Sequence, residues 1–368
     1  MTIDWSTRAV PQSAALHPYV PGKPVEMLLR EKGLERAIKL ASNENPYGPA
    51  PKAIVAMKNM ASEVHRYPDG DATELKEALA EFHNVCSDRV LTGNGSNEVL
   101  ELLIRTFASA GDEVIFSQCG FIVYALAAQA AGAVGVAVPE SDGLAHDLDA
   151  MAGAVSEKTK IICIANPNNP TGTLHGNDVV QQFLDGLPRD LIVIVDEAYY
   201  EFVADKLGDS ITALCHPGLV ISRTFSKAYG LAGCRVGYAV ADAAIVALAN
   251  RFREPFNVNL LAQSAAVAAL SDLDWVREKV AECKCERERM ESLLSQWDVL
   301  GGHSYGNFVL LRHKSSQEVL RQLEDHGIIP RPLAAYGMVD FLRISVGTAK
   351  ENTEFLSVLE RIITDLKD

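Results

Sequence analysis

The chain has 368 residues, and its 34 lysines and arginines against 48 aspartates and glutamates give a net charge of −14 with no basic stretch, so we expect no nucleic-acid partner. Its seven cysteines are odd in number and scattered, which argues against a disulfide framework. Cys283 and Cys285 have no second pair of metal ligands nearby in the sequence, so no metal site is predicted. The first residues contain an acid and no apolar core, and the apolar stretch 121–138 is broken by glycines, so we expect a cytoplasmic protein with neither a secretory signal nor a membrane span.

Three parts are predicted along the chain. Residues 1–40 form an arm and the start of a smaller domain, and prolines at positions 18, 21 and 24 predict an extended segment laid over a partner or over a cleft. Strands and helices alternate over residues 41–255, which is typical of a large α/β domain with a mostly parallel sheet. Residues 256–368 are expected to form a linking helix and a small C-terminal α+β domain, in which Thr348 and Glu351 form a capping box for a last helix from Glu351 to Leu366.

A glycine-rich turn precedes the first strongly periodic helix of the large domain. The run from Leu91 to Glu98 reads Leu-Thr-Gly-Asn-Gly-Ser-Asn-Glu and is followed by apolar residues at helical spacing. Free N–H groups and the positive end of a helix dipole make Gly95, Ser96 and Asn97 candidate phosphate donors. The same pattern is also typical of an ordinary helix cap, so the turn alone does not decide between the two.

Two apolar strands end in polar side chains. Residues 160–165 are followed by Asn-Pro-Asn-Asn-Pro-Thr-Gly, which places Asn169 at a strand's carboxyl end, and residues 191–195 end at Asp196 with Tyr199 three residues later. Ligands of open α/β sheets collect at this edge, so Asp196 is well placed to pair with a pyridine nitrogen, and Tyr199 and Asn169 to bind the ring oxygen. The alternatives are an aspartate that caps a helix, a tyrosine that packs on the sheet, and a plain turn.

Lys227 lies in a run, Ser222 to Arg235, that carries hydroxyls and a trailing arginine. Its primary amine can condense with the aldehyde of pyridoxal phosphate, while Ser226 and Arg235 bind the phosphate. A solvated loop explains the run equally well when it is taken by itself.

The ordered set of these four motifs resembles the fold-type I pyridoxal-phosphate aminotransferases. The likeness extends from about Tyr19 to the last helix, and it implies a three-layer α/β/α large domain. Within that superfamily, residues 42–49, 66–70, 255–259 and 340–348 are similar to the histidinol-phosphate aminotransferases. One departure is Phe121, which stands where many relatives stack a tyrosine on the cofactor ring, and phenylalanine keeps the flat apolar face.

The resemblance implies a role for each matching residue. Lys227 carries the cofactor and moves the proton, Asp196 holds the pyridinium, and Tyr199 binds the ring oxygen, so these three are the expected catalytic residues. Tyr47 is expected to reach the cofactor phosphate of a partner subunit, although other family members carry that tyrosine at the position of Asn45. The implied cofactor-binding residues are Gly95, Ser96, Asn97, Phe121, Asn169, Asp196, Tyr199, Thr224, Ser226, Lys227, Arg235 and Tyr47, and the implied substrate-binding residues are Tyr19, Asn43, Arg331 and Arg343.

The expected activity is transamination between histidinol phosphate and 2-oxoglutarate, giving imidazole acetol phosphate and glutamate in histidine biosynthesis, by a homodimer with shared active sites. Arg343 is expected to bind a phosphate or a carboxylate with one guanidinium fork, and Arg331 and Tyr19 to add contacts to the phosphate. Three alternatives stay open: an aromatic amino-acid aminotransferase, a threonine-phosphate decarboxylase, and a cofactor-binding protein of the same fold that lacks the chemistry.

Overall fold

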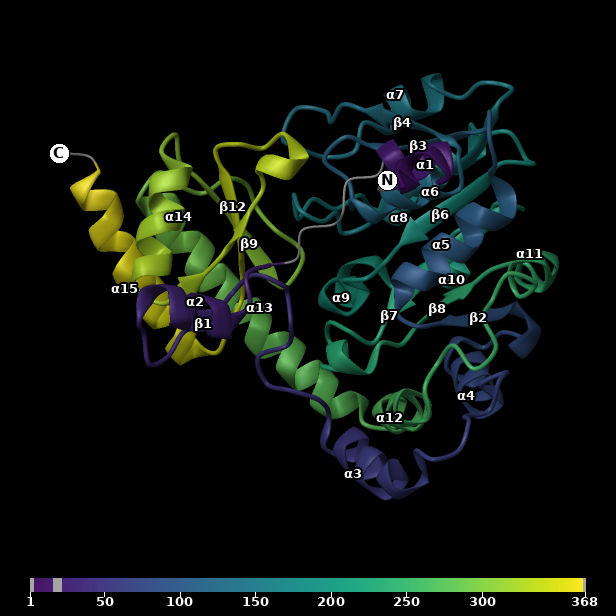
Figure 1. Ribbon diagram of the computed structural model, residues 1–368, viewed down its shortest axis with the longest axis horizontal. Coiled ribbons are helices and arrows are strands. Elements are labelled where there is room, and N and C mark those ends of the chain that lie inside the picture. Colours follow the sequence, from purple (N-terminus) through teal and green to yellow (C-terminus); the bar gives the residue numbers. More distant parts are fainter. Residues whose placement is uncertain (1–2, 16–21, 367–368) are drawn as a thin grey trace.

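The computed structural model describes residues 3–15 and 22–366, which form two domains (Figure 1). The large domain is built on a seven-stranded sheet with the order β2-β8-β7-β6-β5-β3-β4. Only β8 runs antiparallel to its neighbours, so the expectation of a mostly parallel sheet is confirmed. The strands are β2 (Val90–Gly93), β3 (Glu113–Ser117), β4 (Val134–Val138), β5 (Thr159–Ala165), β6 (Ile192–Asp196), β7 (Leu219–Thr224) and β8 (Gly237–Val240).

Helices cover both faces of this sheet because its central strands are apolar on both sides. In β6, Ile192 and Ile194 face one hydrophobic cluster, whereas Val193 and Val195 face another, as the two-residue period of a strand requires. The first cluster includes α5 (Ser96–Phe107), α6 (Val123–Ala130) and α11 (Ala243–Ala249), and the second includes α7 (Leu148–Gly153) and α8 (Asn177–Asp185). The chain therefore has the three layers that its family resemblance implied.

The small domain contains an antiparallel sheet with the order β11-β12-β9 and a short parallel pair, β1 with β10. The strands are β1 (Ile38–Lys39), β9 (Phe308–Arg312), β10 (Ile328–Ile329), β11 (Arg331–Pro332) and β12 (Phe341–Ser345). The helices α2 (Val25–Lys32), α14 (Ser316–Asp325) and α15 (Ala349–Asp365) belong to this part of the fold (Figure 1). The predicted capping box of Thr348 and Glu351 is present, and α15 begins at Ala349, two residues before the expected start, because Thr348 is the N-cap.

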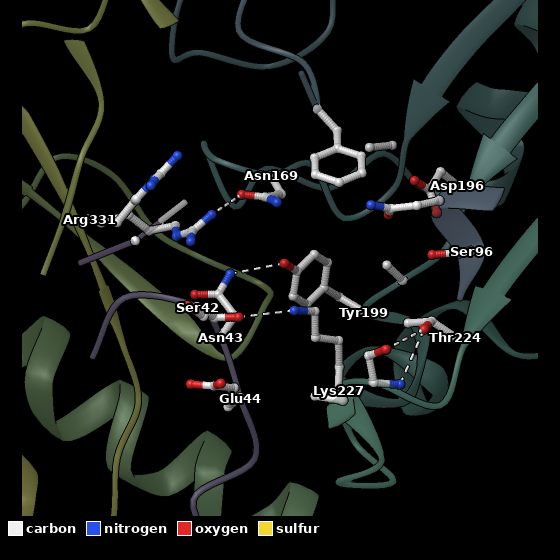
Figure 2. A pocket seen from close by; sticks show the side chains of 18 of the residues that line it. Ser42, Asn43, Glu44, Ser96, Asn169, Asp196, Tyr199, Thr224, Lys227 and Arg331 are labelled. Atoms are coloured by element: carbon white, nitrogen blue, oxygen red, sulfur yellow. Dashed lines mark hydrogen bonds between the residues drawn. The ribbon is translucent and has the colours of Figure 1, made fainter. Parts of the chain in front are cut away.

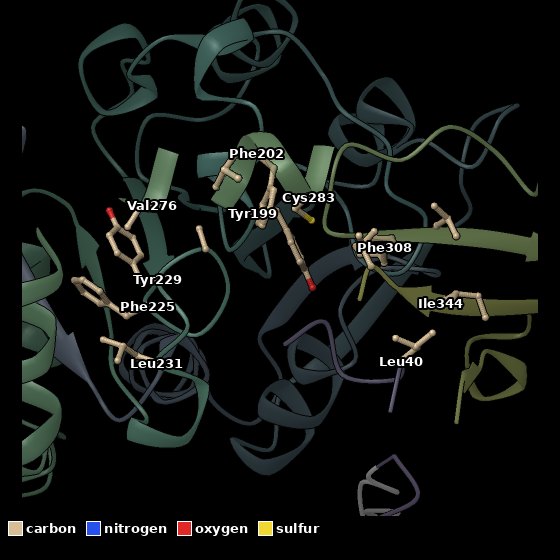
Figure 3. Close-up of a cluster of buried hydrophobic side chains, with 14 of the residues drawn as sticks. Leu40, Tyr199, Phe202, Phe225, Tyr229, Leu231, Val276, Cys283, Phe308 and Ile344 are labelled. Carbon is tan, nitrogen blue, oxygen red and sulfur yellow. The ribbon is translucent and has the colours of Figure 1, made fainter. Parts of the chain in front are cut away.

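The long helix α13 (Leu273–Gln296) connects the two domains and follows α12 (Leu260–Leu270) after a short corner (Figure 1). One continuous apolar cluster extends from Phe225, Tyr229 and Val276 at the large-domain end to Phe308 and Ile344 of the small domain (Figure 3). This shared core fixes the position of the small domain relative to the carboxyl edge of the large sheet. The remaining helical segments are α1 (Pro11–Ala15), α3 (Pro51–Met60), α4 (Thr73–His83), α9 (Ala204–Leu207), α10 (Ser210–Ala213), η1 (Trp5–Thr7), η2 (Ala61–Glu63), η3 (Ser87–Arg89), η4 (Tyr200–Phe202), η5 (Ala232–Cys234) and η6 (Ala334–Tyr336).

The apolar stretch 121–138 contains α6 and β4. The helix buries Tyr124, Ala127 and Ala128, whereas β4 is the edge strand of the sheet and leaves Val134 half exposed. Within residues 3–15 and 22–366, no helix combines the length and the apolar character that crossing a membrane requires.

Candidate active site

A cavity of about 370 Å³ lies where the carboxyl ends of three parallel strands meet the small domain. The last residues of β5, β6 and β7, which are Ala165, Asp196 and Thr224, all line it. Figure 2 shows side chains from both domains around this space. Most of the predicted residues are brought together here, namely Asn43, Ser96, Asn97, Phe121, Asn169, Asp196, Tyr199, Thr224, Ser226, Lys227, Arg235, Arg331 and Arg343.

Asp196 is a buried carboxylate held by two hydroxyl groups. Its Oδ2 accepts a hydrogen bond of 2.9 Å from the Tyr124 hydroxyl, and its Oδ1 accepts one of 2.9 Å from the Ser222 hydroxyl. Burial raises the pKa of Asp196, and these two donors oppose that rise. Sequence reasoning assigned no role to Tyr124 or Ser222, because each becomes a neighbour of Asp196 only through the packing of α6 and the pairing of β7 with β6.

Lys227 lies in the loop that follows β7, and its amine points into the cavity (Figure 2). The Nζ atom donates to the backbone carbonyl of Ser42 at 3.1 Å and lies 5.9 Å from the centre of the Tyr199 ring. Burial lowers the pKa of this lysine to about 7, and the positive charge of Arg343 adds to the effect. At neutral pH a large fraction of the amine is therefore uncharged, which is the state a nucleophile or a general base needs.

Tyr199 is joined to the small domain by a buried hydrogen-bond chain. Its hydroxyl accepts a hydrogen bond of 2.9 Å from Asn43 Nδ2. The Oδ1 atom of Asn43 in turn accepts a hydrogen bond from the Ser345 hydroxyl. Burial raises the pKa of Tyr199 to about 12, so the phenol keeps its proton. A protonated phenol can donate to a ligand oxygen while it accepts from Asn43.

Hydrogen-bond donors gather at the N-terminus of α5. Gly95, with φ at +83°, is the residue before the helix, and a Cβ atom built on it would lie 2.3 Å from Arg235 Nη2. Arg235 Nη1 also lies 3.4 Å from Ser226 Oγ, and the Thr224 hydroxyl donates to the same Ser226 oxygen at 3.0 Å. The helix end, the hydroxyls and the guanidinium therefore lie together in one corner whose donors suit an anion, and we call it the anion-binding corner.

The two predicted substrate arginines are cross-strand neighbours. Arg331 on β11 is paired in register with Arg343 on β12, and both line the cavity. Arg343 Nη1 donates to Asn169 Oδ1, and its Nη2 donates to the carbonyl of Ala41 at 2.7 Å. Asn169 therefore contacts the substrate-side arginine directly, a contact that spans 174 positions of sequence.

Three predicted aromatic residues remain, namely Phe121, Tyr47 and Tyr19. Phe121 lines the cavity, and its ring meets the Tyr124 ring edge-on with 5.9 Å between the centroids. Tyr336 also lines the cavity, although it was not predicted from the sequence. Tyr47 does not line the cavity of its own chain, and its ring instead lies 5.3 Å from Lys279 Nζ on α13. Tyr19 is outside the described residues. Across the described residues, no three His, Cys, Asp or Glu side chains are grouped so as to hold a metal ion.

Comparison with known proteins agrees with this geometry. The sequence profile described as aminotransferase class I and II matches residues 35–359. The histidinol-phosphate aminotransferase of Methylobacillus flagellatus is 46% identical over 353 residues, which cover 95% of each chain, and histidinol-phosphate aminotransferase 2 of Pseudomonas aeruginosa is 44% identical over 368 residues, covering 98% of this chain and 99% of that one. The crystal structure of the histidinol-phosphate aminotransferase from Sinorhizobium meliloti, in complex with pyridoxal-5'-phosphate, superimposes with a TM-score of 0.90 at 29% identity and covers 98% of both chains. The chain therefore belongs to the class I and II aminotransferases, in the histidinol-phosphate aminotransferase family.

Proposed function

We propose that this enzyme exchanges an amino group between histidinol phosphate and 2-oxoglutarate, in either direction, with pyridoxal 5'-phosphate as its cofactor. The observation that carries the proposal is the placement of the Lys227 amine in the same cavity as the cross-strand pair Arg331 and Arg343. The names of the close relatives and the cofactor in the Sinorhizobium meliloti structure support it. Histidine biosynthesis is the pathway that this reaction serves.

The residues of the cavity fit pyridoxal phosphate at each of its ends. The anion-binding corner at the N-terminus of α5 offers donors for the phosphate, and the close approach of Arg235 to Gly95 explains why a side chain is absent there. Asp196 offers a buried carboxylate for the ring nitrogen, and Phe121 offers a flat apolar face. When it is bound, this cofactor supplies an electron-withdrawing ring that stabilises negative charge on the substrate carbon that bears the nitrogen.

The side chains of the enzyme then divide the work of binding and proton transfer. Lys227, as a neutral amine, takes the proton from the substrate carbon that bears the nitrogen and later returns a proton. The hydrogen bonds from Tyr124 and Ser222 favour the ionised form of Asp196, and an ionised Asp196 would hold a proton on the ring nitrogen of the cofactor. Tyr199, which is held in place by Asn43, would donate to the ring oxygen of the cofactor.

The substrate end of the cavity must accept two different anions. Histidinol phosphate has a phosphate and no carboxylate, whereas glutamate and 2-oxoglutarate have two carboxylates. A guanidinium binds either group through two parallel N–H donors, so Arg343 can serve both substrates. Arg331, on the neighbouring strand, would add a second positive charge for the doubly charged phosphate, and its pairing in register with Arg343 supports this role.

Half-reactions test the proposal directly. Purified holoenzyme is mixed in turn with histidinol phosphate, glutamate, phenylalanine and threonine phosphate, and the visible absorbance of the bound cofactor is followed. We expect rapid changes with the first two compounds and slower changes with phenylalanine. Faster turnover of phenylalanine than of histidinol phosphate would favour the aromatic aminotransferase, and release of carbon dioxide from threonine phosphate would favour the decarboxylase. Borohydride reduction of the holoenzyme should attach the cofactor to the peptide that contains Lys227.

We also propose that two copies of this chain share their active sites in a cytoplasmic homodimer. Tyr47 lies outside the cavity of its own chain, and Tyr67 is 81% exposed while its ring stacks on Phe256 at 4.7 Å between centroids. Exposed aromatic pairs of this kind favour a protein interface. In such a dimer Tyr47 would reach the cavity of the partner subunit, as its family resemblance implies. Sedimentation velocity tests the dimer, and a monomer at micromolar concentration would contradict it.

A further inference from the structure

The Ser345 hydroxyl on β12 joins the small domain to Asn43. Ser345 is buried, and it lies two positions after Arg343, so both side chains extend from the same face of the strand. The backbone N–H of Asn43 donates to Ser345 Oγ at 2.7 Å, and Ser345 Oγ donates to Asn43 Oδ1 at 2.9 Å. The strand that carries the arginine proposed to bind the substrates therefore also carries the hydroxyl that holds Asn43.

The small domain also fixes the backbone of Asn43. Its φ of +54° lies in the left-handed region, which asparagine adopts more readily than most residues. The N–H group is bound by Ser345, and the carbonyl accepts a hydrogen bond of 3.0 Å from Asn307 Nδ2. Because Asn43 is only 1% exposed, its side-chain amide has no access to bulk water and must find its partners inside the protein.

The hydrogen of the Ser345 hydroxyl decides which way round the Asn43 amide lies. A backbone N–H only donates, so Ser345 Oγ accepts from it and must direct its own single hydrogen elsewhere. Among the described residues, Asn43 Oδ1 is the acceptor that this hydrogen reaches. If the amide were reversed, the hydroxyl hydrogen would be buried without an acceptor, which is costly. The Oδ1 atom therefore faces Ser345, and the Nδ2 atom faces Tyr199.

The orientation of the Asn43 amide in turn decides the role of the Tyr199 hydroxyl. An amide NH₂ group only donates, so the phenol oxygen accepts from Nδ2 at 2.9 Å (Figure 2). Burial raises the pKa of Tyr199 to about 12, so the phenol keeps its hydrogen. Within residues 3–15 and 22–366 this hydrogen has no acceptor, and Tyr199 lines the cavity. The phenol is therefore a donor in reserve for a bound molecule.

We propose that Ser345 is a positioning residue that directs the hydrogen of the Tyr199 hydroxyl to the ring oxygen of the cofactor, acting through the Asn43 amide. Without the serine hydroxyl, the amide can turn its Oδ1 atom toward Tyr199, which then donates to Asn43 instead of the cofactor. The ring oxygen thereby loses a donor that stabilises negative charge on it. This inference rests on the proposed function only through the cofactor, because the substrates take no part in it.

The other ionisable groups around Tyr199 are untouched by a substitution at position 345. Besides burial, the pKa of Tyr199 is lowered by the charge of Arg343 and raised by Asp196 and Tyr336, and the Lys227 amine lies 5.9 Å from the ring centre. The ring itself packs edge-on against Phe308 at 5.5 Å between the centroids. A change that depends only on a hydroxyl at position 345 therefore reports the hydrogen-bond chain and not these charges.

A pH titration of the visible absorbance of the holoenzyme tests the proposal, because the spectrum of the bound cofactor changes when its ring system gains or loses a proton. A donor at the ring oxygen stabilises the negatively charged form, so loss of the donor raises the pKa of the bound cofactor. Tyr199→Phe removes the donor, and we expect a rise of about one to two pH units, as for one charge-assisted hydrogen bond. Ser345→Val should raise the same pKa by at least about half a unit.

Three comparisons separate the hydroxyl from the packing around it. Ser345→Thr has the shape of the valine variant but keeps the hydroxyl, so it should titrate like the wild type. In the Tyr199→Phe background, Ser345→Val should add no further shift, because the residue through which Ser345 acts is already inactive. Ser316→Ala is a control at another buried serine of the small domain, whose hydroxyl donates to the carbonyl of Val339, and it should also titrate like the wild type.

Several results would overturn the proposal. These are an unchanged pKa in Ser345→Val, equal shifts in the threonine and valine variants, or additive shifts in the double variant. An unchanged pKa in Tyr199→Phe would show that the ring oxygen takes no hydrogen bond from Tyr199, and the proposal would fail with it. Should Ser345→Val not fold, Ser345→Ala is compared with Ser316→Ala in the same way. Failure of the proposed function is visible separately, as a holoenzyme that titrates but does not react with histidinol phosphate.

Discussion

Removing the Tyr124 hydroxyl tests how the buried acid Asp196 is kept charged. Tyr124→Phe deletes the donor that lies 2.9 Å from Asp196 Oδ2 and leaves the ring, which is fully buried, in place. The Ser222 hydroxyl, at 2.9 Å from Oδ1, remains. The carboxylate then keeps only part of its stabilisation, so its pKa rises and its hold on the cofactor nitrogen weakens.

The size of the effect follows from the loss of one hydrogen bond to a charged group. Such a bond contributes about 1.5–3 kcal/mol, which corresponds to a decrease in kcat of roughly 10- to 100-fold if the charge on Asp196 matters fully in the transition state. Asp196→Asn removes the charge entirely and should cost more in kcat while the cofactor stays bound.

Half-reaction rates with histidinol phosphate, followed by stopped-flow absorbance, measure this effect. Ser222→Ala removes the matching donor on the other oxygen and should give a loss of similar size. Tyr200→Phe is the control, because the Tyr200 hydroxyl donates to the carbonyl of Gly208 and does not contact Asp196. A wild-type kcat in Tyr124→Phe, with an unchanged dependence of the cofactor absorbance on pH, would refute the argument.

The other predictions concern the lysine, the anion-binding corner and the arginine pair. In the cofactor-free protein, burial lowers the pKa of Lys227 from its ordinary value of 10.5 to about 7. Between these two pH values the unfolded chain binds more protons than the folded chain, so the free energy of unfolding rises with pH. Thermal melts should therefore show a smaller increase of melting temperature with pH in Lys227→Met than in the wild type. Gly95→Ala puts a Cβ atom 2.3 Å from Arg235 at a positive φ, so equilibrium dialysis should show weaker cofactor binding, and wild-type affinity would contradict a role for this corner. Arg343→Lys should lower kcat/KM in both half-reactions. Arg331→Ala should raise KM for histidinol phosphate more than KM for glutamate, and an equal increase for the two substrates would contradict a specific role of Arg331 in binding the phosphate.

The sequence alone determined the fold class and most of the candidate cofactor site. Asp196 and Asn169 follow apolar strands directly, and the glycine turn precedes a helix, so local patterns along the chain place these residues at one edge of a parallel sheet. The roles of Arg343 and Lys227 also depended on the order of the motifs, because each motif alone is common in proteins. The Phe121 position and the Thr348 capping box were likewise readable from short runs.

The tertiary structure decided every contact that joins distant segments. Tyr124 reaches Asp196 across 72 positions because α6 packs on the sheet, and Ser222 meets the same residue because β7 and β6 pair in register. The neighbouring positions of Arg331 and Arg343 follow from the antiparallel register of β11 and β12, and no pattern in one strand specifies its partner's register. Local propensities set where strands and helices lie along the chain, whereas burial of the shared core sets which of their side chains meet.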